Sequence, residues 1–93
     1  MTTAQSIART WLDAERTRRG NASRPRTQAY QRAVGRQEGV AEVARCRGWV
    51  RGTGYVEAMG RKTLKALPVA PGPDWLNEAT THMAELLQAE AER

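Results

Sequence analysis

Apolar residues recur at helical spacing in four stretches of the chain. The first stretch carries an apolar stripe at positions i, i+3, i+4, i+7 and i+8, which predicts an amphipathic helix over residues 3–19. Thr2 and Gln5 have the spacing of a capping box at the start of this helix, and Gly20 stands where a helix commonly stops. The stripe consists of Ala4, Ile7, Ala8, Trp11 and Leu12.

A second helix is predicted over residues 26–47, with Pro25 suited to its first turn. Its apolar seam repeats at spacings of four and three, as in a heptad, but it carries small residues where a strong coiled coil has Leu or Ile. Gly35 and Gly39 each cost up to about 1 kcal/mol relative to Ala inside a helix. The pattern therefore leaves open whether this helix is continuous or breaks between the two glycines. The seam consists of Tyr30, Val34, Gln37, Ala41, Ala44 and Gly48.

Two further helices are predicted over residues 54–66 and 75–91. Thr53 is suited to cap the first of them and Asp74 the second. Residues 68–74 hold three prolines and cannot be helical throughout, so we expect an extended, stiff connector. No stretch shows the alternation typical of a strand, and the predicted fold is therefore all-α with three to four helices. The connector divides the chain into a basic helical region (1–67), the connector itself (68–74) and an acidic, amphipathic C-terminal helix (75–93).

Bulky apolar side chains are scarce. The chain has one Ile, six Leu, six Val and no Phe among 93 residues, a share below the roughly 20% at which disorder becomes a concern. The net charge is only +5 and the apolar residues are regularly spaced, which argues against disorder throughout. We therefore expect a helical protein that completes its core against a partner, as a homo-oligomer or in a larger protein assembly. The surface predicted for this packing is the stripe of the last helix: Trp75, Leu76, Ala79, Met83, Leu86 and Leu87.

Charge is distributed unevenly along the chain. Residues 1–36 carry a net charge of +6 and residues 68–93 a net charge of −4. A segment rich in arginine binds a phosphate backbone without reading its sequence, or it docks on an acidic protein surface; solvation alone is the third interpretation. The densest run spans residues 16–26 and holds Arg16, Arg18, Arg19, Arg24 and Arg26.

A glycine-rich break at residues 48–54 separates the second and third predicted helices. Backbone N–H groups in such turns hold phosphate, and aromatic side chains beside them stack on unpaired bases. The alternative is an interhelical turn with its aromatics in the core and its arginines solvated. The candidate residues here are Arg45, Arg47, Arg51, Trp49 and Tyr55.

Other motifs carry weaker signals. The spacing from Ala44 to Gly48 fits a helix-turn-helix motif with residues 54–66 as the recognition helix. The segment between the two predicted helices, however, is longer than the usual turn of three or four residues. Glu78, His82 and Glu85 share a helix face, yet the sequence offers no second group to complete a metal site. The single cysteine, Cys46, is expected to be a small packing residue. We therefore predict no metal and no cofactor.

These observations indicate a binding protein and not an enzyme, because no nucleophile, base and oxyanion donor can be assembled from the motifs. With one cysteine, no signal peptide and no long apolar run, we expect a cytoplasmic or particle-borne protein that does not contact a membrane. Three hypotheses remain. The first is a structural component of a multimeric nucleoprotein particle, such as that of a phage. The second is a DNA-binding transcriptional regulator, and the third is a small inhibitor that blocks a host protein surface.

Overall fold

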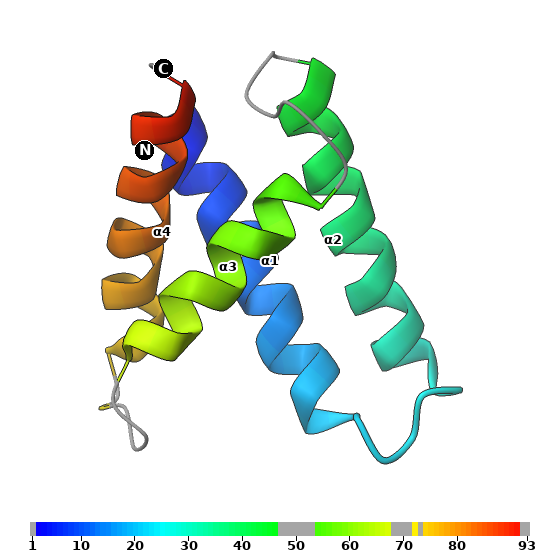
Figure 1. Cartoon of the computed structure of the whole chain (residues 1–93). Helices are drawn as coiled ribbons and strands as arrows, with labels where there is room; N and C mark the ends of the chain where they lie inside the picture. Colours follow the sequence, from blue (N-terminus) through cyan, green and yellow to red (C-terminus); the bar gives the residue numbers. More distant parts are fainter. Residues whose placement is uncertain (1, 47–53, 68–71, 73, 92–93) are drawn as a thin grey trace.

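The fold consists of four helices, and the last three pack around the first. The structure, a computed structural model, describes residues 2–46, 54–67, 72 and 74–91. It contains α1 (Thr3–Gly20), α2 (Gln28–Cys46), α3 (Tyr55–Ala66) and α4 (Trp75–Ala91). The described ranges contain no strand, so the prediction of an all-α fold is confirmed. Helix α1 contacts the other three helices, with α4 on one side, α2 on the other, and α3 crossing in front of it (Figure 1).

Helix α1 begins at the predicted capping box. Gln5 N donates a hydrogen bond to Thr2 Oγ1 at 3.2 Å, and Thr2 N donates one to Gln5 Oε1 at 2.9 Å. The predicted stop is shifted by one residue, because Gly20 is still helical and Asn21 is the C-cap. The Asn21 side-chain amide donates a hydrogen bond to the Thr17 carbonyl at 2.8 Å. The Asn21 backbone N–H also donates to the Arg18 carbonyl at 3.2 Å, so Asn21 caps this helix in place of a left-handed glycine.

Helix α2 starts later than predicted and is unbroken. Residues 24–27 form a turn in which Thr27 N donates a hydrogen bond to the Arg24 carbonyl at 3.1 Å. The helix begins at Gln28, where Thr27 Oγ1 accepts a hydrogen bond from Tyr30 N at 3.3 Å. The helix then runs through both interior glycines, and a Cβ added at either one would meet nothing within 4 Å. These glycines therefore mark neither a break nor a close approach of another described segment.

Helices α3 and α4 lie where the apolar pattern placed them. Gly54 is the N-cap of α3, with a left-handed φ of 81° that favours glycine, and its carbonyl accepts a hydrogen bond from Ala58 N at 2.8 Å. Thr53, the predicted cap, lies outside the described residues. Helix α4 begins at Trp75, and the Asp74 carbonyl accepts hydrogen bonds from Asn77 N and Glu78 N. Most of the proline-rich connector also lies outside the described ranges.

The core is built largely from small residues. Seven of the 13 buried apolar residues are alanines, which let helix backbones approach one another closely. The largest side chain of this core, Trp11, is 2% exposed and packs on α3 at Gly60. A Cβ built on Gly60 would lie only 2.3 Å from Trp11 Cζ3. Alanines, and one glycine that admits an indole ring, therefore compensate for the shortage of bulky apolar residues. The core cluster consists of Ala4, Ile7, Ala8, Trp11, Leu12, Ala44, Val56, Ala79, Met83, Ala84 and Leu87.

The stripe of α4 that was predicted to pack on a partner is used mainly within the chain. Ala79, Met83 and Leu87 have no exposed surface and belong to the core, so the prediction that they contact a second molecule needs correction. Trp75 and Leu76 are partly buried and pack against the same core. The physical reason is that α1 already offers an apolar stripe that matches the stripe of α4. Leu86 is partly buried.

No helix in the described part of the chain is both long enough and apolar enough to cross a lipid bilayer.

Candidate nucleic-acid interface

Four arginines from two helices share one flank of the molecule. Arg9 and Arg16 stand two turns apart on α1, and Arg36 of α2 lines the same surface hollow of about 440 Å³. Arg32 lies one turn before Arg36 on the same side of α2. We call these four residues the arginine face. The side chains of Arg16 and Arg36 are 56% and 57% exposed, so their guanidinium groups are accessible to a ligand.

Three of these guanidinium groups lie within 4 Å of a polar side-chain oxygen. Asp13 Oδ1 accepts a hydrogen bond from Arg16 Nη2 at 2.6 Å, and Asp13 Oδ2 lies 3.9 Å from Arg36 Nη1. Arg9 Nη1 donates a hydrogen bond to Asn77 Oδ1 of α4 at 2.8 Å. Each guanidinium has five N–H donors and uses few of them in these contacts. Surface ion pairs contribute little to stability, so this arrangement mainly concentrates positive charge around one carboxylate.

Of the arginine face, only Arg16 was predicted from the sequence to be a contact residue. Arg16 belongs to the dense run at residues 16–26, whereas the face is formed across two antiparallel helices. The signal was nevertheless present: Arg9 and Arg16 are seven residues apart, and Arg32 and Arg36 are four apart, so each pair lies on one side of a helix.

A second group of arginines surrounds the turn between α1 and α2. Arg19 at the end of α1 and both Arg24 and Arg26 in the turn are exposed. The turn is held by its own hydrogen bonds, since Arg24 N donates to the Asn21 carbonyl at 2.9 Å and Gln31 Nε2 donates to the Pro25 carbonyl at 2.7 Å. Arg24 and Arg26 also flank a shallow hollow of about 430 Å³ on the turn surface. These predicted contact residues are therefore accessible.

Arg18 differs from the other arginines of the run because it is engaged within the protein. Its Nη1 donates a hydrogen bond to Gln37 Oε1 at 3.3 Å and lies 3.6 Å from Glu15 Oε1. A hydrogen bond with Tyr30 is the main cause that raises the pKa of Arg18 above its ordinary value. Gln37 in turn donates from Nε2 to the Trp11 carbonyl at 3.3 Å. Arg18 thus ties α1 to α2 while remaining charged.

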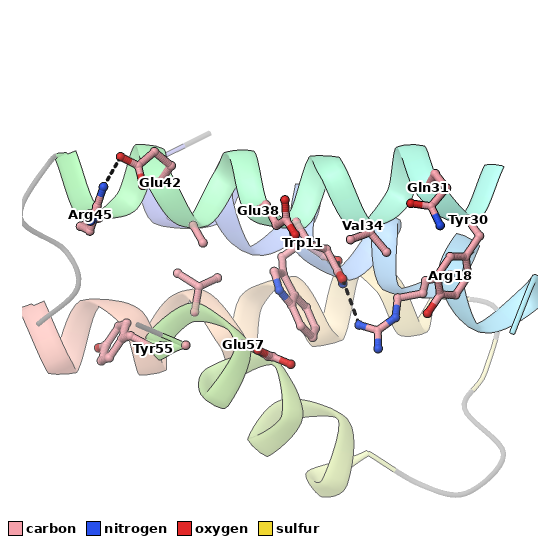
Figure 2. Close-up of a pocket in the computed structure, with 14 residues that line it drawn as sticks. Trp11, Arg18, Tyr30, Gln31, Val34, Glu38, Glu42, Arg45, Tyr55 and Glu57 are labelled. Atoms are coloured by element: carbon pink, nitrogen blue, oxygen red, sulfur yellow. Dashed lines mark hydrogen bonds and ion pairs between the residues drawn. The ribbon is translucent and has the colours of Figure 1, made fainter. Parts of the chain in front are cut away.

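A groove of about 590 Å³ lies between α2 and α3. Figure 2 shows Trp11 at its base, with Tyr30 and Arg18 near one end and Tyr55 near the other. Tyr55, a predicted base-stacking residue, is partly buried and packs against the core beside this groove. Glu38 and Glu42 of α2 and Glu57 of α3 add three carboxylates to the lining.

Two of these carboxylates already have arginine partners. Glu42 accepts a hydrogen bond from Arg45, which lowers the pKa of Glu42 and raises the pKa of Arg45. Glu57 accepts a hydrogen bond from Arg61 one turn later on α3. Glu38 is exposed and forms no ion pair within the described part of the chain. Helix α2 therefore carries Arg32 and Arg36 on one flank, whereas Glu38 and Glu42, together with Arg45, lie on the flank that borders the groove.

The remaining predicted residues fall into three groups. Arg47, Trp49 and Arg51 lie outside the described residues, together with most of the glycine-rich break. Arg45 is exposed and borders the groove through its pair with Glu42. Cys46 is also exposed, which corrects its expected role as a packing residue. Its Sγ donates to Glu42 Oε1 at 3.7 Å.

In the ranges that the structure covers, no three His, Cys, Asp or Glu side chains come close enough to hold a metal ion. No protein-family model matches the chain, and the comparisons with curated proteins and with solved structures gave no match. The candidate site therefore consists of four arginines on one flank, three exposed and one half-buried, and of a groove with carboxylates and aromatic rings on the other.

Proposed function

We propose that this protein is a non-enzymatic structural component of a nucleoprotein assembly, in which the arginine face binds the phosphate backbone of a nucleic acid. The observation that carries the proposal is the convergence of Arg9, Arg16, Arg32 and Arg36 on one flank, with Asp13 as the acidic side chain among them. Guanidinium groups match phosphate oxygens in geometry and in charge. Backbone contacts of this kind give affinity without sequence preference.

Reversing the charge of Arg32 and Arg36 should weaken binding to a short DNA duplex by at least about ten-fold at low salt, because two phosphate contacts are lost. The negative slope of log K against log salt should also become shallower by about 2, since each of the two lost contacts contributes about −0.9. Fluorescence anisotropy of a labelled duplex, titrated with wild-type protein and with the Arg32→Glu, Arg36→Glu variant, measures both quantities.

The matched control is Lys62→Glu with Lys65→Glu. It makes the same change in net charge at two exposed positions on α3, away from the arginine face. This variant should retain most of the affinity and most of the salt slope of the wild type. Equal losses for the two double variants would show that net charge alone drives binding, and the arginine face would lose its assigned role.

The regulator and inhibitor hypotheses predict different behaviour in the same experiments. A transcriptional regulator prefers particular duplex sequences, whereas the arginine face should bind duplexes of equal length with similar affinity. An inhibitor of another protein needs a partner-binding surface but no nucleic acid. For that hypothesis the relevant feature is the groove between α2 and α3, and binding to a duplex should then be absent.

A further inference from the structure

We propose that the groove between α2 and α3 accepts the arginine-bearing turn, residues 21–27, of a second copy of this chain. Copies would then associate head to tail. This inference rests on the assembly role proposed above and names the partner, but it does not require nucleic acid. It assigns the turn to protein contact and leaves the arginine face on the flank for the phosphate backbone.

The groove has the chemistry that holds a guanidinium group. Glu38 is exposed on the groove side of α2 and has no ion-pair partner in the described ranges. Across the groove, Glu57 projects from α3 toward the space below α2 (Figure 2). Glu57 already accepts a hydrogen bond from Arg61 but keeps further lone pairs, so both carboxylates can accept hydrogen bonds from inserted arginine side chains. Tyr30 and Tyr55 add aromatic surface at the two ends, on which a guanidinium stacks favourably.

The turn has the complementary properties. Arg24 and Arg26 are exposed and form no ion pair with any described carboxylate. Pro25 between them restricts the backbone, and Thr27 Oγ1 donates a hydrogen bond to the Arg24 carbonyl at 2.9 Å. Because the turn is already ordered by its own contacts, docking it costs less conformational entropy than docking a flexible loop.

The contact must join two molecules. Neither Arg24 nor Arg26 of the same chain lines the groove, and the hydrogen bond from Gln31 to the Pro25 carbonyl holds the turn at the end of α2. The two complementary surfaces are different patches of one chain, so the interface is heterologous and each added copy exposes a new groove or a new turn. Such an interface builds a ring or a filament.

Two charge-neutralising variants test the proposal when they are studied alone and mixed. The turn variant carries Arg24→Gln and Arg26→Gln, and it keeps an intact groove. The groove variant carries Glu38→Gln and Glu57→Gln, and it keeps an intact turn. Sedimentation velocity on nuclease-treated protein gives the mass of each sample. Circular dichroism verifies that both variants retain the helicity of the wild type.

Wild-type protein should show species larger than the 10.3 kDa chain, increasing with concentration and decreasing with salt. Each variant alone should be monomeric. An equimolar mixture should form a dimer and nothing larger, because the intact turn of one variant meets the intact groove of the other. The Arg32→Glu, Arg36→Glu variant should assemble like the wild type, which separates this inference from nucleic-acid binding.

A wild type that stays monomeric up to millimolar concentration would overturn the proposal. A mixture of the two folded variants that stays monomeric would overturn it as well, even if the wild type associates. Mixed variants that assemble beyond a dimer would show that another surface joins the copies, which also contradicts the assignment. None of these outcomes depends on whether the arginine face binds a duplex.

Discussion

Replacing Gly60 with alanine should lower the free energy of unfolding by about 1–3 kcal/mol, the usual cost of overpacking a core. The added Cβ would lie 2.3 Å from Trp11 Cζ3 and 2.6 Å from two other ring atoms. The indole is 2% exposed, so it cannot move into solvent without exposing the core. Either α3 moves away from α1 or the ring is displaced, and both responses cost packing energy. Urea denaturation followed by circular dichroism at 222 nm measures the change.

The same substitution at Gly35 and Gly39 provides the matched control. Both glycines lie inside α2, and an added Cβ at either position meets nothing within 4 Å. Each Gly→Ala change there should raise the free energy of unfolding by up to about 1 kcal/mol, because alanine is the better helix former. If Gly60→Ala raised the free energy of unfolding as much as these two changes, the close contact between the Trp11 ring and Gly60 of α3 would be contradicted.

Truncating Leu87 to alanine should destabilise the protein by about 2–5 kcal/mol, the cost of removing a fully buried leucine side chain. Leu87 has no exposed surface and belongs to the core cluster with Met83 and Leu12. A loss of this size is a large share of the 5–15 kcal/mol that typically separates folded from unfolded states. Thermal and urea unfolding at low protein concentration, where self-association is negligible, isolate the effect on the single chain.

Leu86 is the natural control because it is the adjacent residue with the same side chain. It is only partly buried, so Leu86→Ala should cost clearly less than Leu87→Ala. If α4 instead turned this stripe toward a second molecule, both changes would reduce association while leaving the stability of the monomer nearly unchanged. Similar stability losses at the two positions would contradict the orientation of α4.

The helices could be predicted because their signal is local. An apolar stripe at helical spacing, a capping box at Thr2 and Gln5, and an acidic residue before Trp75 all lie within a few residues of the boundary they define. The predicted end of α1 and the predicted start of α2 were wrong by one or two residues, because side-chain hydrogen bonds occur at both boundaries. Asn21 ends α1 in place of a glycine, and Thr27 starts α2 in place of Pro25. A side-chain hydrogen bond lies at each of these boundaries.

The core and the candidate surfaces were less accessible from the sequence. A count of bulky residues predicted a shortage, but it did not show that Gly60 admits Trp11 or that alanines close the helix contacts. Similarly, the arginines form their face only because α1 and α2 are antiparallel, which brings Arg36 to Asp13. A contact between residues on different helices cannot be predicted from their positions in the sequence. Two residues that share one side of a single helix can be predicted from their spacing.

Mapping the duplex on the protein by nuclear magnetic resonance tests the central claim most directly. Titrating a short DNA duplex into isotope-labelled protein should shift the amide and arginine side-chain signals of residues 6–16 and 32–36, which carry the arginine face. Signals from the buried side of α4 should remain in place. Shifts confined to α3, as a recognition helix would give, or no shifts at low salt, would contradict the assignment of this face to the phosphate backbone.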